Sequence, residues 1–145
     1  MHLIVDGFGG DPARLQNAEL IHHFLDTYPA AIGMTKIAPA KVFTYIGVKS
    51  EDWGVSGFVI IAESHISIHT FPERSYVNID VFSCKEFDAE AVAADVQELF
   101  QFDRTEWRVL HRGLEYPHNL TPALRTAREE RLQVAAATVK VTGHE

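Results

Sequence analysis

Two consecutive β patterns meet at Glu63-Ser64-His65 without a residue that favours a turn. Val55–Ala62 is apolar on both of its faces and is expected to be well buried. Ser64–Phe71 alternates, with apolar side chains on one face and histidines and serine on the other. The junction contains no Gly, Pro, Asn or Asp. On pattern alone it is a bulge or an open corner, whereas the serine and histidines around it suggest a chemical role.

The rest of the chain supplies further strands and two amphipathic helices. The expected elements are a strand at His2–Phe8, a helix over Ala13–Phe24 that ends before Pro29 and Gly33, strands at Val42–Ile46, Val55–Ala62, Ser64–Phe71 and Tyr76–Cys84, a helix at Asp88–Phe100, a strand at Thr105–Leu110, and a charged helix at Thr121–Val134. The order β-α-β-β-β-β-α-β predicts an α/β (α+β) two-layer sandwich, with an antiparallel or mixed sheet and both main helices on one face. We expect one domain over residues 1–120 and a C-terminal helical tail over residues 121–145.

Composition limits the function further. A chain of 145 residues forms one ordinary domain, and its net charge of −7 disfavours binding to nucleic acid or an anionic membrane while it tolerates a cationic substrate. The N-terminus lacks the pattern of a signal peptide, and no apolar run approaches a membrane span, so a cytoplasmic protein is expected. The single cysteine, Cys84, excludes an internal disulfide and a Cys-rich zinc site.

His65, His69 and Cys84 admit two general interpretations. A metal site fails on spacing, because strand residues four apart are about 13 Å apart whereas zinc ligands converge on one ion, and no metal is expected. A Cys-His hydrolase would use Cys84 as nucleophile and a histidine as base, but no glycine-rich oxyanion signature accompanies it. That hydrolase remains an alternative.

One stretch of the sequence resembles a known family. Ala62–Glu73 reads AESHISIHTFPE; it is preceded by GVSG at Gly54–Gly57 and followed by DVFSC at Asp80–Cys84. Together these motifs resemble the core of the bacterial and archaeal S-adenosylmethionine decarboxylases, and the similarity extends from about His2 to Gly113. Members of this family are proenzymes that form their own pyruvoyl cofactor by cutting the chain before a serine.

The resemblance implies that this chain is cut between Glu63 and Ser64 into residues 1–63, the β chain, and 64–145, the α chain. The hydroxyl of Ser64 would attack the carbonyl of Glu63 in an N-to-O acyl shift, with Ser56 donating to the developing oxyanion. His69 matches the base that removes the α-proton of Ser64. Elimination and hydrolysis would then leave a pyruvoyl group at position 64. His65 is expected to be structural or to lie near the site.

In the mature enzyme, the resemblance implies that the substrate amine forms a Schiff base with the pyruvoyl group and that Cys84 returns a proton after carbon dioxide leaves. Glu73 matches a residue that binds the ribose hydroxyls. The product, decarboxylated S-adenosylmethionine, is the aminopropyl donor of spermidine and polyamine biosynthesis. Neither cleaved chain holds a complete core, so both would stay associated, and two such protomers would form a homodimer whose sites each use residues of both.

Three positions depart from the family pattern. Phe71 replaces a tryptophan, and Lys85 follows Cys84 where glycine is usual. The aromatic segment that stacks on adenine is replaced by KSEDW, residues 49–53, so Trp53 or Phe8 would have to take its place.

The acidic pair Glu51-Asp52 in that segment could instead face a guanidinium or ammonium group. A pyruvoyl-dependent arginine or ornithine decarboxylase is therefore the leading alternative. An uncleaved, non-catalytic partner subunit is the second alternative.

Overall fold

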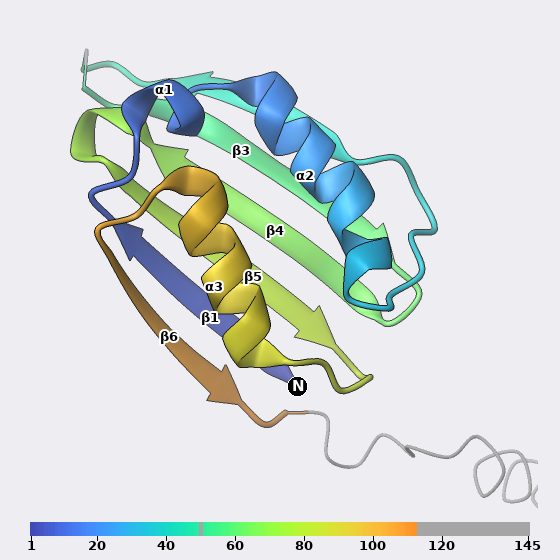
Figure 1. The fold of residues 1–145 in the computed structure, drawn as a ribbon. Coiled ribbons are helices and arrows are strands. Elements are labelled where there is room, and N and C mark those ends of the chain that lie inside the picture. The colour runs from blue at the N-terminus through green and yellow to red at the C-terminus, as the bar shows by residue number, and fades with distance from the viewer. Residues whose placement is uncertain (50, 113–145) are drawn as a thin grey trace, which may run out of the picture. The chain divides into compact units, whose positions relative to one another are not determined.

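The computed structural model describes residues 1–49 and 51–112 (Figure 1). The elements are β1 (His2–Phe8), α1 (Pro12–Leu15), α2 (Ala18–Ala31), β2 (Lys41–Ile46), β3 (Trp53–Ile61), β4 (Ser64–Phe71), the short 3-10 helix η1 (Pro72–Arg74), β5 (Tyr76–Ser83), α3 (Ala89–Phe100) and β6 (Arg104–Leu110). The predicted tail helix and the boundary at residue 120 lie outside the described residues. Among the helices described, none is long and apolar enough to cross a membrane.

The strands form one sheet in the order β2-β3-β4-β5-β1-β6, and every neighbouring pair is antiparallel. Figure 1 shows α2 and α3 side by side over the same face of this sheet. The predicted α+β two-layer sandwich is confirmed, and its sheet is antiparallel rather than mixed. None of the helices described lies over the other face, which we call the open face (Figure 1).

The core lies between the two helices and the sheet because alternate strand residues point toward the helices. Its largest fully buried side chains are Phe100, Leu3, Leu15, Ile21, Leu25, Ile61, Ile66, Ile68, Ile79, Val5, Val55 and Val59. Burying each side chain of this size stabilises the fold by about 1.5–3 kcal/mol.

The N-terminal helical segment differs from the prediction at two places. It is split, because Asn17 caps a new helix by accepting a hydrogen bond from the Leu20 N–H (3.0 Å). It also continues through Pro29, which is buried in the last turn of α2, and the chain leaves at Gly33 with φ 71°. The apolar spacing predicted one face of the helix correctly but carried no signal for the break.

The prediction that β3 is buried on both faces is wrong. Val55, Val59 and Ile61 are buried, whereas Phe58 and Ile60 are 41% and 37% exposed on the open face. The apolar character of this second face therefore has no counterpart layer within the described chain.

The junction between β3 and β4 is also tighter than expected. Ile61 pairs with Ser64, so Ala62 and Glu63 form a two-residue turn rather than a bulge or an open corner. Two-residue hairpins usually need glycine or asparagine, and this one contains neither.

Candidate active site

Ser64 has an unusual backbone conformation at the first position of β4. Its φ is 154°, a value that residues other than glycine rarely adopt. The other two described non-glycine residues with positive φ, Ser75 and Gln101, have values of 45° and 55° in the ordinary left-handed region. Among the described residues, backbone strain is therefore greatest at Ser64, directly after the Glu63-Ser64 peptide bond.

This conformation brings the side chain of Ser64 toward the preceding carbonyl. Around the N–Cα bond of an L-residue, Cβ lies about 120° from the carbonyl carbon, so a φ of 154° turns the Cβ of Ser64 to roughly 34° from eclipsing the Glu63 carbonyl carbon. In a regular antiparallel strand, where φ is near −140°, the same angle is about 100°. This conformation favours closure of the five-membered ring that forms when Ser64 Oγ bonds to the Glu63 carbonyl carbon.

Hydrogen bonds hold both sides of the Glu63 residue. Its carbonyl oxygen accepts from the backbone N–H of Cys84 (3.0 Å), and its side chain accepts from the Thr35 N–H (3.0 Å). Ser64 is paired with Ser83, the last residue of β5. Cys84 itself carries a free, exposed thiol. The structure therefore brings the backbone of Cys84 next to Glu63 and Ser64, although it lies far from them in the sequence.

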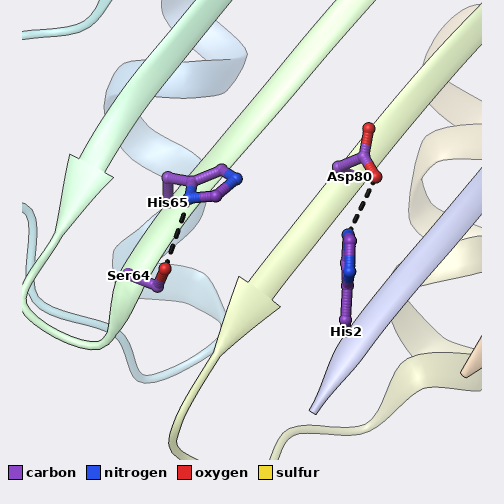
Figure 2. A network of polar contacts seen from close by, with 4 residues as sticks. All are labelled: His2, Ser64, His65 and Asp80. Atoms are coloured by element: carbon purple, nitrogen blue, oxygen red, sulfur yellow. Dashed lines mark hydrogen bonds and ion pairs between the residues drawn. The ribbon is translucent and has the colours of Figure 1, made fainter. Parts of the chain in front are cut away.

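His65 contacts the hydroxyl of Ser64. The distance from His65 Nδ1 to Ser64 Oγ is 3.3 Å (Figure 2). The His65 ring packs edge-on against Phe82, with centroids 5.7 Å apart, and the His2 ring lies 5.4 Å from the same phenylalanine. His2 Nε2 in turn lies 2.8 Å from Asp80 Oδ1 (Figure 2). The sequence had led us to expect that His65 is structural or lies near the site, and the contact with Ser64 places it at the site.

Ser56 and His69 form a second cluster farther along the sheet. The Ser56 hydroxyl and His69 Nδ1 are 2.9 Å apart, on neighbouring strands. His69 lies five positions along β4 from Ser64, which corresponds to about 16 Å in an extended strand. The two predicted processing residues are therefore in contact with each other but not with the serine of the same chain.

Trp53 and Glu73 lie toward this second end of the sheet. The indole N–H of Trp53 donates to a Glu73 carboxylate oxygen (3.1 Å), which joins two residues that were predicted separately to bind substrate. Strands β3 and β4 pack closely here, since a Cβ at Gly54 would lie 1.9 Å from the Thr70 carbonyl oxygen. The predicted acidic pair, Glu51 and Asp52, is exposed in the turn before β3.

A polar network that sequence analysis missed occupies the open face beside His69. Asn78, which pairs with His69, donates to the Asp6 carboxylate (2.6 Å), and the Tyr76 hydroxyl donates to the same oxygen (2.6 Å). Burial, followed by the hydrogen bond to Asp6, raises the pKa of Tyr76, so Tyr76 remains a neutral donor. The alternation in β1, β4 and β5 was the signal, because it puts these polar residues on one face.

The described ranges hold no group of three or more His, Cys, Asp or Glu side chains positioned to bind a metal ion. His65 and His69 both lie on the open face but at separate places along β4, and each contacts a different serine.

The fold and the site together define an α+β sandwich with a strained serine at a hairpin, on whose open face polar side chains lie beside exposed apolar ones. Comparison with known proteins is more specific. The family model described as S-adenosylmethionine decarboxylase matches residues 1–113. The chain therefore belongs to the S-adenosylmethionine decarboxylase family.

Individual relatives agree with this assignment. An S-adenosylmethionine decarboxylase proenzyme of Clostridium botulinum (strain Langeland) is 40% identical over 113 residues, which cover 77% of this chain and 92% of that protein. One from Thermococcus gammatolerans is 35% identical over 116 residues, covering 79% of this chain and 76% of that protein. The crystal structure of the adenosylmethionine decarboxylase from Aquifex aeolicus matches with a TM-score of 0.64 and 29% identity, over 78% of this chain and 89% of that one.

Proposed function

We propose that this protein is a self-processing proenzyme that cuts its Glu63-Ser64 bond and then decarboxylates S-adenosylmethionine. The observation that carries the proposal is the conformation of Ser64, whose φ of 154° turns its side chain toward the carbonyl it must attack. Family membership supports the substrate, since the relatives are named for S-adenosylmethionine.

Processing begins when the Ser64 oxygen adds to the carbonyl carbon of Glu63. Negative charge then develops on the Glu63 oxygen, which already accepts a hydrogen bond from the Cys84 N–H. A donor that is in place before charge develops stabilises the intermediate without reorganisation. When the carbon–nitrogen bond breaks, the amide becomes an ester, and the strained backbone conformation of Ser64 is released.

The residues present fit a pyruvoyl group derived from Ser64, because the serine sits at a strand end outside the packed core, where the Cys84 backbone N–H bonds to the preceding carbonyl. Such a group supplies a carbonyl that accepts electrons as carbon dioxide leaves the substrate. Cys84 is the proposed donor of the proton that replaces the lost carboxylate. Glu73 and Trp53 bind the nucleoside part, with Glu73 oriented by the indole N–H.

A second copy of the chain completes this site. The base His69 and the donor Ser56 are required at Ser64, yet their distance along β4 prevents this within one chain. Two open faces packed around a two-fold axis would exchange these residues. The large apolar side chains exposed on that face support such packing: Phe43, Tyr45, Phe58 and Ile60.

The proposed reaction yields decarboxylated S-adenosylmethionine, the aminopropyl donor for polyamine synthesis, and we place it in the cytoplasm. Intact-mass analysis of freshly purified, denatured protein tests the processing. Two masses that match residues 1–63 and 64–145, with a pyruvoyl group replacing Ser64, are expected; one uncut mass contradicts the proposal. Release of carbon dioxide from S-adenosylmethionine, arginine and ornithine, measured in parallel, then tests the substrate.

A further inference from the structure

The geometry points to a catalytic residue in the first processing step: we propose that His65 takes the hydroxyl proton of Ser64 as its oxygen attacks the Glu63 carbonyl. The inference rests on the proposed function, because it concerns how the Glu63-Ser64 bond is cut. The family resemblance assigns processing roles to Ser56 and His69 but none to His65.

Ser64 and His65 are in side-chain contact although they are consecutive in a strand. Consecutive side chains of a regular strand point to opposite faces of the sheet, so a residue and its successor do not normally meet. Ser64 Oγ nevertheless lies 3.3 Å from His65 Nδ1. The positive φ of Ser64 is the departure from strand geometry that allows this. One backbone distortion thus turns the serine side chain toward both its electrophile and a base.

The His65 ring is held in a defined orientation by Phe82. Its ring packs at 68° to the ring of Phe82, and the Arg112 guanidinium lies 4.1 Å from the centroid of that phenylalanine. His2 also contacts Phe82 but is engaged by Asp80 at 2.8 Å. Figure 2 shows the two histidines engaged separately, His65 with Ser64 and His2 with Asp80.

The other groups of the same chain that could take the Ser64 proton, His69 and Cys84, are engaged elsewhere or distant. His69 is bonded to Ser56 and lies five positions along the strand. Cys84 contributes its backbone N–H to the Glu63 oxygen, where a donor is needed rather than a base. Among the described residues, His65 provides the imidazole that contacts the nucleophilic oxygen.

The step balances in protons and bonds. With the proton of neutral His65 on Nε2, Nδ1 accepts the Ser64 hydroxyl proton while the bond from Oγ to the Glu63 carbon forms. The carbon–nitrogen bond then breaks, and the imidazolium returns the proton to the departing nitrogen of Ser64. The products are an ester and a free amine, and His65 is neutral again. No oxidant, reductant or metal takes part.

The test follows processing of the full chain in cell-free translation by intact mass over time. We expect His65→Ala and His65→Asn to slow cutting by about a hundredfold or more, the usual contribution of a general base. Asn keeps a hydrogen-bond acceptor without basicity, so it separates proton transfer from orientation. Added imidazole is expected to restore cutting in His65→Ala. His2→Gln, which removes a neighbouring imidazole from the same aromatic cluster, is expected to process at the wild-type rate.

Hydroxylamine identifies the step that fails, because it cleaves an ester but leaves an amide intact. We expect the stalled His65→Ala protein to resist hydroxylamine, as an amide would. A stalled protein that hydroxylamine cuts has already formed its ester and overturns the inference. Wild-type cutting rates in His65→Ala or His65→Asn overturn it as well, while the proposed function stands. A wild-type chain that never splits refutes the proposed function itself, and this inference with it.

Discussion

The two ends of strand β4 carry similar residue types in different settings. At its start, Ser64 contacts His65 and lies beside Cys84, and the backbone is distorted. Near its other end, Ser56 on β3 contacts His69 across a regular ladder. Both pairs join a serine to a histidine, but only in the first does the serine itself have a strained backbone that turns its side chain toward the preceding carbonyl.

This difference shows that a serine-histidine pair does not by itself define a nucleophile. The Ser56 end is fixed by ordinary strand pairing and by Thr70, whose hydroxyl bonds to both the N–H and the C=O of Val55. This regular backbone can hold a base such as His69 in a fixed position, but it does not expose a strained peptide bond to the Ser56 hydroxyl. The Ser64 end is a tight turn without glycine, where the backbone is strained and the proposed cut occurs.

Replacing the nucleophile has the largest expected effect. Ser64→Ala removes the attacking oxygen, so both chain cutting and carbon dioxide release are expected to disappear completely. Intact mass and a decarboxylation assay measure the two effects. Ser67→Ala, on the same strand, is the matched control and should be processed normally. If the Ser64→Ala chain is still cut, Ser64 is not the nucleophile and the two ends of β4 do not differ in this respect.

Mixing two inactive chains tests whether the two ends meet across a dimer. Ser64→Ala and His69→Ala are each expected to be inactive alone. If each site takes Ser64 from one protomer and His69 from the other, the heterodimer has one complete site and regains about half of the wild-type turnover. Heterodimers are isolated from co-expression with two different tags. No recovery would show that both residues act within one chain.

Substitution of Cys84 is expected to lower turnover without preventing processing. Cys84→Ala keeps the backbone N–H that bonds to the Glu63 oxygen, so the chain should still be cut. Loss of the thiol is expected to lower kcat about a hundredfold or more, because a general acid is missing. Comparison of the mass and turnover assays measures this difference. Full turnover with the correct product would place the proton donor elsewhere.

Substrate binding at the Trp53 end has the smallest expected effect. Trp53→Ala removes a stacking surface worth about 1–3 kcal/mol, which corresponds to a roughly five- to 150-fold rise in KM. Trp53→Phe keeps a ring but frees Glu73, and a smaller rise is expected. Trp107→Ala, on the edge strand β6, is the control with an unchanged KM. An unchanged KM in Trp53→Ala would leave adenine stacking to Phe8 or another residue.

The amino-acid sequence alone was sufficient for the layers and for most strands. Alternation in Ser64–Phe71 and in β5 predicted which side chains are buried, because period-two patterns specify a face. It failed for β3, whose apolar open face it interpreted as core. It also missed the helix break before Asn17, because capping is a local hydrogen bond that apolar spacing does not encode.

The sequence by itself determined the sheet, its helix-covered face and the residue types available for chemistry, since these follow from periodicity and composition. Tertiary structure decided which of them meet. The pairing of β4 with β5 puts the Cys84 N–H on the Glu63 oxygen, and the tight turn forces Ser64 to a φ of 154° and its hydroxyl onto His65. Such contacts depend on strand register and on one backbone angle, which residue patterns do not encode.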